Sequence, residues 1–209
     1  MSDLALVVPV KSSGKSRLSP VLSAEERRAL SVALFRGVMK AVRGAGLIGS
    51  CLVVSSDSDV LSTASKCGAT PVEEPGDRGV NAAVERGMGE AGWAAQFLVI
   101  PSDLPLLKSS DLTDLLRLRA AGVGLLISPS AAFDGTNALL FPRGLRFPLS
   151  YDRDSFWNHL RSASELGLRT GIFAKGGVMF DVDSPEDLRA LAASASRSEA
   201  ASIARGALR

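Results

Sequence analysis

The stretch Leu4-Ala5-Leu6-Val7-Val8-Pro9-Val10 is a continuous apolar run that ends in a polar loop containing glycine. A run of this kind is typical of a β-strand buried on both faces, as in the parallel sheets of α/β proteins. The next segment begins with Ser23-Ala24-Glu25-Glu26, a capping box that predicts the start of a helix. A buried strand followed by a capped helix is the basic unit of an α/β fold.

The same alternation of strand and helix continues along the chain. It predicts an α/β protein with a mainly parallel, mixed sheet flanked by helices. We expect a single domain over residues 1–193 and a C-terminal tail, 194–209, that can form a frayed helix. The expected strands are 4–10, 51–55, 70–72, 96–100, 124–128, 137–141, 169–173 and 178–181, and the expected helices are 24–44, 57–66, 80–91, 109–121, 155–166 and a last one from 185.

Composition excludes several classes of protein. With 24 Lys+Arg against 22 Asp+Glu, the chain lacks the strongly basic balance typical of nucleic-acid binding. Two cysteines and one histidine cannot form a disulfide framework, a structural zinc site or a site of several histidines. No apolar run approaches the roughly 20 residues that cross a bilayer, and no signal-peptide pattern begins the chain. We therefore expect a cytoplasmic protein without membrane or nucleic-acid partners.

Two glycine motifs resemble nucleotide-binding signatures but have the wrong context. Gly14-Lys15-Ser16 resembles the end of a P-loop, yet Pro9 stands where that motif needs glycine. The run 44–49 matches G-x-G-x-x-G, but it ends a helix instead of opening one. The first loop still offers Lys11, Lys15 and Arg17 at the end of a strand, where α/β sheets bind ligands. The alternative is a solvated basic loop.

Three carboxylates are candidate metal ligands. Asp103 directly follows the strand 96–100, and Asp181 and Asp183 have the i, i+2 spacing that puts two side chains on one side of an extended segment. Mg²⁺ typically binds one or two protein carboxylates and completes its shell with phosphate and water. If these acids cluster, their repulsion should raise at least one of their pKa values. The alternative is that the carboxylates serve as turn or helix-cap residues.

Two hydroxyl side chains are candidates for holding a small anion. Thr136 joins a loop to a strand, and Ser155 opens a helix, where backbone amides favour phosphate or carboxylate. Either could instead be an ordinary turn or N-cap residue. His159 lies four residues into the same helix with no second histidine or cysteine partner, so we interpret it as structural or at the rim of a pocket.

These motifs occur together in one known family. The combination resembles 2-phospho-L-lactate guanylyltransferase, an enzyme of coenzyme F-420 biosynthesis, over about residues 4–191. The stretches that carry the resemblance are Val8-Pro9-Val10-Lys11, residues 15–23, Glu26-Arg27, Pro101-Ser102-Asp103-Leu104-Pro105-Leu106, Gly135-Thr136-Asn137-Ala138-Leu139, Ser155-Phe156 and residues 181–188.

The resemblance implies a GT-A-like, Rossmann-related nucleotidyltransferase fold. It also implies that GTP condenses with a phosphorylated three-carbon acid and releases pyrophosphate. The acid would be 2-phospho-L-lactate, phosphoenolpyruvate or 3-phosphoglycerate, which the sequence does not separate; a homodimer is a candidate assembly. By matching positions, the implied catalytic residues are Lys15, Arg17 and Asp103; the nucleotide-binding residues are Pro9, Val10, Lys11, Ser12, Lys15, Arg17, Asn81, Pro101 and Ser102; the acid-binding residues are Thr136, Asp152 and Ser155; and the Mg²⁺ ligands are Asp103, Asp181 and Asp183.

One position departs from the family pattern. The family often has glycine three residues before the serine of the Ser-Phe pair, and here that residue is Asp152. Its carboxylate either points away from an anionic substrate or contributes to metal or water contacts. Two rival functions also remain: a nucleotidyltransferase of the same fold acting on a sugar phosphate or molybdopterin, and a non-catalytic nucleotide-binding homologue.

Overall fold

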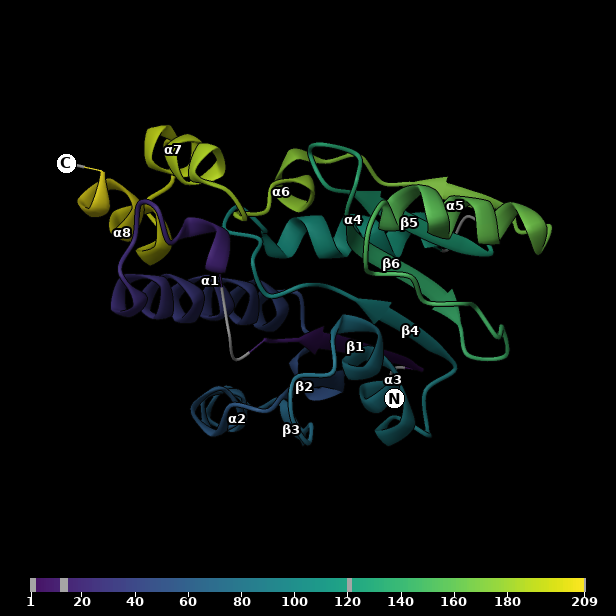
Figure 1. The fold of residues 1–209 in the computed structure, drawn as a ribbon. Helices are drawn as coiled ribbons and strands as arrows, with labels where there is room; N and C mark the ends of the chain where they lie inside the picture. The colour runs from purple at the N-terminus through teal and green to yellow at the C-terminus, as the bar shows by residue number, and fades with distance from the viewer. Residues whose placement is uncertain (1–2, 12–14, 120–121, 209) are drawn as a thin grey trace.

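A seven-stranded mixed sheet forms the centre of the molecule in this computed structural model, which describes residues 3–11, 15–119 and 122–208 (Figure 1). The strand order is β3-β2-β1-β4-β6-β5-β7; β6 is antiparallel to both of its neighbours, and the remaining pairs are parallel. The predicted mainly parallel sheet is confirmed. The strands are β1 (Leu4–Pro9), β2 (Cys51–Ser55), β3 (Thr70–Glu73), β4 (Gln96–Val99), β5 (Leu125–Pro129), β6 (Thr136–Pro142) and β7 (Thr170–Ile172).

Helices cover both faces of the sheet because its central strands are apolar on both sides. Along β1, Leu4, Leu6 and Val8 pack in one core cluster, and Ala5 and Val7 pack in the other. The first cluster includes side chains of α1, α4 and α6, and the second includes side chains of α3 and α5. The helices are α1 (Ala24–Gly44), α2 (Ser58–Lys66), α3 (Val80–Glu90), α4 (Ser109–Arg119), α5 (Ser155–Glu165), α6 (Gly176–Met179), α7 (Pro185–Ala193) and α8 (Glu199–Ala207).

The capping signals predict where the helices begin and end. The Ser23 hydroxyl accepts from the Glu26 N–H at 3.2 Å, and the Glu26 carboxylate accepts from the Ser23 N–H at 2.8 Å. Helix α1 ends at Gly44, and Gly46 has a positive φ of 73°, as expected for glycines that terminate a helix. The interpretation of 44–49 as a helix end instead of a dinucleotide motif is confirmed.

The predicted strand at 178–181 is wrong. Residues 176–179 form the short helix α6, and this turn of helix directs the Val178 and Met179 carbonyls to the Asn137 amide, at 3.0 Å each. Gly177 permits the turn, because a Cβ there would lie 2.5 Å from an Asp111 carboxylate oxygen. The run is apolar, as expected of a strand, but only Val178 is fully buried, and these tertiary contacts favour a helix.

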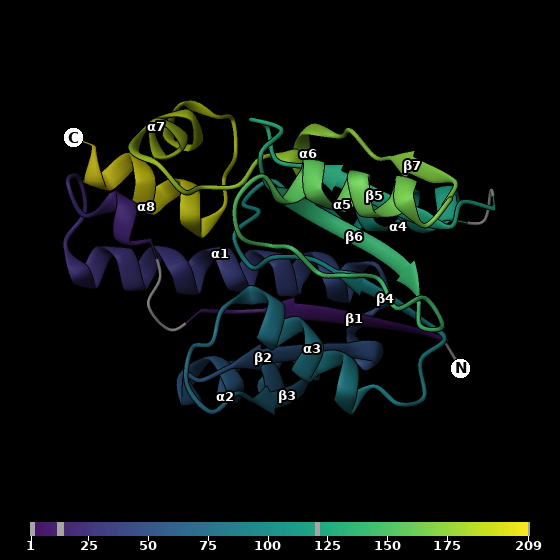
Figure 2. The same cartoon turned by 45° about the vertical axis from the view of Figure 1, so that its right-hand side comes forward.

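Over the described residues the C-terminal tail forms the packed helix α8. Helix α8 packs on α1, together with α7, at one end of the molecule (Figure 2). Its Ala200, Ala201 and Ala204 are buried against a cluster that contains Leu30 and Leu34 of α1. Small side chains allow the two helices to approach closely, and the burial fixes the tail. No helix in the described part of the chain is long and apolar enough to span a membrane.

Candidate active site

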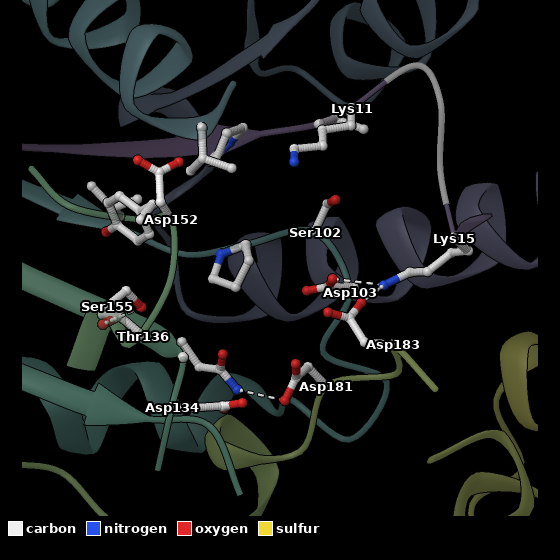
Figure 3. A pocket seen from close by; sticks show the side chains of 18 of the residues that line it. Lys11, Lys15, Ser102, Asp103, Asp134, Thr136, Asp152, Ser155, Asp181 and Asp183 are labelled. Carbon is white, nitrogen blue, oxygen red and sulfur yellow. Dashed lines mark hydrogen bonds and ion pairs between the residues drawn. The ribbon is translucent and has the colours of Figure 1, made fainter. Parts of the chain in front are cut away.

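A pocket of about 610 Å³ opens where β1 and β4 end and β6 begins (Figure 3). Because β6 runs antiparallel to β4, with Val99 paired to Leu139, the start of β6 lies beside the end of β4. Residues that follow parallel strands therefore meet residues that precede an antiparallel one. Open α/β sheets bind ligands at the carboxyl ends of the strands where the strand order reverses, and here that point lies between β1 and β4.

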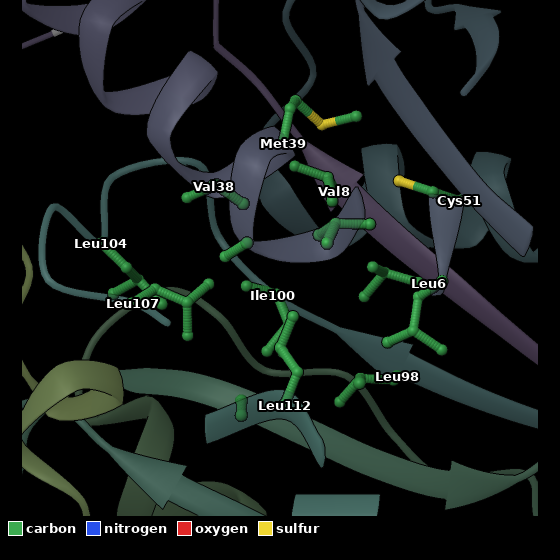
Figure 4. Packing of buried hydrophobic residues seen from close by; sticks show 14 of the residues in the cluster. Leu6, Val8, Val38, Met39, Cys51, Leu98, Ile100, Leu104, Leu107 and Leu112 are labelled. Carbon is green, nitrogen blue, oxygen red and sulfur yellow. The ribbon is translucent and has the colours of Figure 1, made fainter. Parts of the chain in front are cut away.

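Asp103 and Lys15 form an ion pair in this pocket. The Lys15 Nζ lies 2.7 Å from Asp103 Oδ2 and 2.7 Å from Asp183 Oδ1. Asp103 is held in place by Leu104 and Leu107, which are buried in the core cluster beneath the loop (Figure 4). The loop after β4 thus places its apolar residues in the core and its carboxylate in the pocket.

Asp181 and Asp183 reach the pocket because Val182 between them is buried. Val182 has no exposed surface and packs in the cluster formed by α1, α7 and α8. Residues at i and i+2 of an extended segment lie opposite the residue between them, so both carboxylates face away from this cluster. Asn137 Nδ2 donates to Asp181 Oδ1 at 3.2 Å and fixes that side chain. The cap of α7 is Ser184, which leaves the Asp183 carboxylate to bind Lys15.

The pKa values of Asp181 and Asp183 are shifted in opposite directions. Burial, with the charge of Asp103 second, raises the pKa of Asp181 to about 6. Burial would also raise the pKa of Asp183, but the adjacent Lys15 ammonium outweighs it and holds that pKa below its usual value. Burial lowers the pKa of Lys15, but Asp103 and Asp183 outweigh burial and raise it. The expectation of a raised pKa among these carboxylates holds at Asp181, but burial, and not repulsion from Asp103, is the larger cause.

The donor set of the pocket fits a hard divalent cation. Asp103 and Asp183 are close enough to share one cation, since both contact the Lys15 ammonium, and Asp181 lies beside them in Figure 3. All three offer oxygen, the ligand atom that Mg²⁺ prefers. Over residues 3–11, 15–119 and 122–208, however, no three acidic, histidine or cysteine side chains are already gathered as a metal-ligand set. The Mg²⁺ site therefore stays a prediction.

Thr136 and Ser155 form a hydroxyl pair on the opposite side of the pocket. The Ser155 Oγ donates to Thr136 Oγ1 at 3.1 Å, and both side chains are buried at the pocket wall. Thr136 begins β6, and Ser155 is the first residue of α5. The two predicted hydroxyls are thus adjacent, and they lie near backbone amides at the start of a helix, where an anion is favoured.

Asp152 points away from this hydroxyl pair. In Figure 3 its carboxylate lies on the side of the pocket toward β1, apart from Thr136 and Ser155. Its Oδ2 lies 3.4 Å from the Asn81 Nδ2, and Asn81 Oδ1 accepts from the Tyr151 N–H at 2.8 Å. Of the two alternatives for Asp152, the structure favours the first. Asn81 itself is not among the residues that line the pocket and instead holds the 151–152 loop.

The basic loop and the ends of β1 and β4 line the other wall of the pocket. Most of the predicted nucleotide-binding residues lie on this wall; Ser12 lies outside the described residues, and Asn81 lies outside the pocket lining. Their role in nucleotide binding stays a prediction. Those that line the pocket are Pro9, Val10, Lys11, Lys15, Arg17, Pro101 and Ser102.

Sequence reasoning missed several residues of the pocket. Asn137 is only 4% exposed and connects β6 to the segment that carries Asp181. The only sequence signal was an amide side chain at the start of an otherwise apolar strand. Two buried hydroxyls at the pocket wall, Ser31 Oγ and Tyr151 Oη, have no hydrogen-bond partner within the described part of the chain. Each could donate to a bound ligand.

The fold is that of the nucleotidyltransferases. A solved nucleotidyl transferase from Methanothermobacter thermautotrophicus superposes with a TM-score of 0.66 over 90% of this chain and 95% of its own, at 18% identity. A solved CMP:2-keto-3-deoxy-manno-octonic acid synthetase complexed with CTP gives a TM-score of 0.60 over 91% and 97%, at 14% identity. These likenesses establish the class of fold.

Sequence comparison narrows the class to one family. Residues 4–203 match the family described as "Guanylyl transferase CofC like", and the chain belongs to that family. A phosphoenolpyruvate guanylyltransferase from Rubrobacter xylanophilus is 42% identical over 90% of this chain and 93% of its own. A 2-phospho-L-lactate guanylyltransferase from Methanothrix thermoacetophila is 34% identical over 87% and 80%. The resemblance stated from the motifs is confirmed.

Proposed function

We propose that this protein transfers the guanylyl group of GTP to a phosphorylated three-carbon acid and releases pyrophosphate. The observation that carries the proposal is the composition of one pocket. It joins the basic loop after β1, three carboxylates, and the Thr136–Ser155 hydroxyl pair within about 610 Å³. The basic loop can therefore bind a triphosphate, the carboxylates can bind a cation, and the hydroxyl pair can bind a small anionic acid. The relatives named above carry the same activity in their names.

The reaction needs no general base in this pocket. The acid substrate is a phosphate monoester, whose second pKa is near 6, so its oxygen is already anionic at neutral pH. That oxygen attacks the α-phosphorus of GTP, one P–O bond forms, and the bond to the pyrophosphate leaving group breaks. Catalysis then depends on bringing two polyanions together in line and on neutralising their charge.

The described residues divide this work between the walls of the pocket. Lys11, Lys15 and Arg17 would bind the phosphates of GTP, and Thr136 with Ser155 would bind the acid. Asp103, Asp181 and Asp183 would hold Mg²⁺, which when bound neutralises phosphate charge. Lys15 also contacts Asp183 at 2.7 Å, and its ammonium lowers the pKa of that carboxylate.

The acid substrate is the finer part of the proposal. The relatives at 42% and 37% identity are phosphoenolpyruvate guanylyltransferases, and those at 34% and 31% are 2-phospho-L-lactate guanylyltransferases. Both acids carry one carboxylate and one phosphate on adjacent atoms. We expect phosphoenolpyruvate or 2-phospho-L-lactate to be used, and an assay must decide between them.

The deciding experiment is a matrix of four nucleoside triphosphates against four acceptors, measured by Mg²⁺-dependent pyrophosphate release. The acceptors are 2-phospho-L-lactate, phosphoenolpyruvate, 3-phosphoglycerate and a hexose 1-phosphate. The proposal predicts release with GTP and one of the three acids. Release only with the sugar phosphate, or none with any acceptor while GTP still binds, would contradict it.

A further inference from the structure

His159 lies directly behind the acid-binding wall of the pocket. Its side chain has no exposed surface, and its ring packs against Phe147 and Tyr151 with centroids 5.6 and 5.0 Å apart. The Nδ1 lies 3.0 Å from Thr136 Oγ1, and the Nε2 lies 2.9 Å from the Ser150 backbone nitrogen. Both ring nitrogens therefore have a partner, and one of these partners lines the pocket.

The Ser150 contact determines which ring nitrogen carries the proton. A backbone N–H can only donate, so the His159 Nε2 must be the unprotonated nitrogen of the ring. A neutral imidazole has one N–H, which then lies on Nδ1 and donates to Thr136 Oγ1. Burial lowers the pKa of His159 to about 4, in agreement with a neutral ring at physiological pH.

The direction of this hydrogen bond decides what the hydroxyl pair offers to a ligand. Thr136 and Ser155 together have two hydroxyl hydrogens, and their mutual bond uses one. Because the imidazole donates to Thr136, it consumes neither, and one hydrogen remains for the pocket. If the imidazole accepted instead, that hydrogen would be used, and the pair would present only lone pairs. A bound anion needs a hydrogen-bond donor, so only the first arrangement can bind one.

We propose that His159 is a positioning residue for the acid substrate: its Nδ1–H binds one lone pair of Thr136 Oγ1 and so orients the free hydroxyl hydrogen of the Thr136–Ser155 pair toward the anionic group of that substrate. This inference rests on the proposed function, because it concerns the acid of that reaction. His159 is not a base for the reaction. It is not among the residues that line the pocket, and the attacking phosphate oxygen has no proton to lose.

A double-mutant cycle tests the coupling. His159→Phe removes the donor and retains an aromatic ring, and Thr136→Val removes the hydroxyl. We expect His159→Phe to raise the KM for the acid about tenfold, the loss expected for one hydrogen bond to a charged group. The KM for GTP should stay within about twofold of wild type. In the Thr136→Val background, the same change should have almost no further effect, because the group it acts through is absent. Equal effects in both backgrounds would overturn the proposal.

Two further variants separate positioning from packing. Phe147→Leu loosens the packing on the same imidazole ring without touching Thr136, and it should leave the KM for the acid unchanged. His159→Asn places an amide nitrogen near the position of Nδ1 and should restore that KM to within about threefold of wild type. A Phe147→Leu effect as large as that of His159→Phe, or no rescue by His159→Asn, would show that the ring only fills space.

A spectroscopic measurement on the wild-type protein needs neither turnover nor a variant. His159 is the only histidine of the chain, so its two ring nitrogens give an unambiguous ¹⁵N spectrum. We expect a neutral ring at pH 7 with the proton on Nδ1. A proton on Nε2, or a charged ring, would overturn the inference. Failure of the proposed function is distinguishable, because it would appear as absent acid-dependent pyrophosphate release while the tautomer remained measurable.

Discussion

Replacing Asp181 by Asn should stabilise the protein in the absence of metal. The pKa of Asp181 rises from 3.8 to about 6 on folding, chiefly because the carboxylate is buried and secondly because Asp103 is close. A shift of about two units corresponds to ~3 kcal/mol of cost for ionised Asp181. The substituted amide oxygen can still accept the Asn137 hydrogen bond, but the amide is itself a buried polar group. We therefore expect a net gain of ~1–3 kcal/mol in the free energy of unfolding at pH 8.

The pH dependence of this gain is the critical result. Because the folded-state pKa is the higher one, protonated Asp181 favours the folded state, and wild type loses this stabilisation as the pH rises from about 4 through 6. The advantage of Asp181→Asn should thus be small at pH 4, grow up to about pH 6 and be constant above it. A gain that is equal at pH 4 and pH 8 would mean that ionisation is not the cause.

The assay is urea unfolding with a metal chelator present, at pH 4, 6 and 8. Asp183→Asn is the matched control, since Lys15 holds the pKa of Asp183 below its usual value. The free energy of unfolding of that variant should fall by up to ~1 kcal/mol at pH 8, as expected for the loss of a partly exposed ion pair. A loss of stability in Asp181→Asn at pH 8 would refute the reasoning, because a carboxylate whose pKa is raised on folding destabilises the folded protein when it is ionised.

Three other changes have defined outcomes. Asp103→Asn should abolish pyrophosphate release and change the free energy of unfolding by less than ~1 kcal/mol; wild-type turnover at saturating Mg²⁺ would remove Asp103 from the site. Lys15→Ala and Arg17→Ala should each weaken GTP binding, and in wild type this binding should fall steeply with salt, which screens charge attraction; unchanged affinity by calorimetry in both variants would indicate a solvated loop. Gly87→Ala should cost ~1–3 kcal/mol by urea unfolding, because its Cβ would lie 2.7 Å from a valine methyl of β1, whereas Gly89→Ala, with open space, should not destabilise.

The elements that could be predicted from the sequence are those with local signals. The apolar run at 4–10 gives β1, and the capping box at Ser23 gives the start of α1, because burial on both faces and end-capping leave direct marks in the sequence. Asp103 could be placed at the pocket from its position after β4, and Asp181 and Asp183 could be placed on one side of their segment from their i, i+2 spacing. These inferences needed no knowledge of distant contacts.

The errors and omissions all depend on contacts between distant residues. The run 178–181 has an apolar pattern that fits a strand, and only the Asn137 amide, about 40 positions earlier, favours the helix α6. Asn81 was predicted at the nucleotide; in the structure its Oδ1 accepts from the Tyr151 backbone N–H outside the pocket lining, and its role stays a prediction. The interpretation of His159 as structural or at the pocket rim fits its buried position, but its partners Ser150 and Thr136 come together only in the folded protein.

The packing of α8 on α1 has a consequence for biosynthesis. The apolar side chains Leu30 and Leu34 on α1 leave the ribosome early, but the alanines that cover them belong to α8, which is made much later. During synthesis this face is therefore open to unwanted association, the hazard of exposed apolar surface in incomplete chains. Val182 is buried in the same cluster, so α8 also completes the packing around the segment that carries Asp181 and Asp183. In a chain stalled before α8, this cluster would be incompletely packed directly beneath the carboxylate pair.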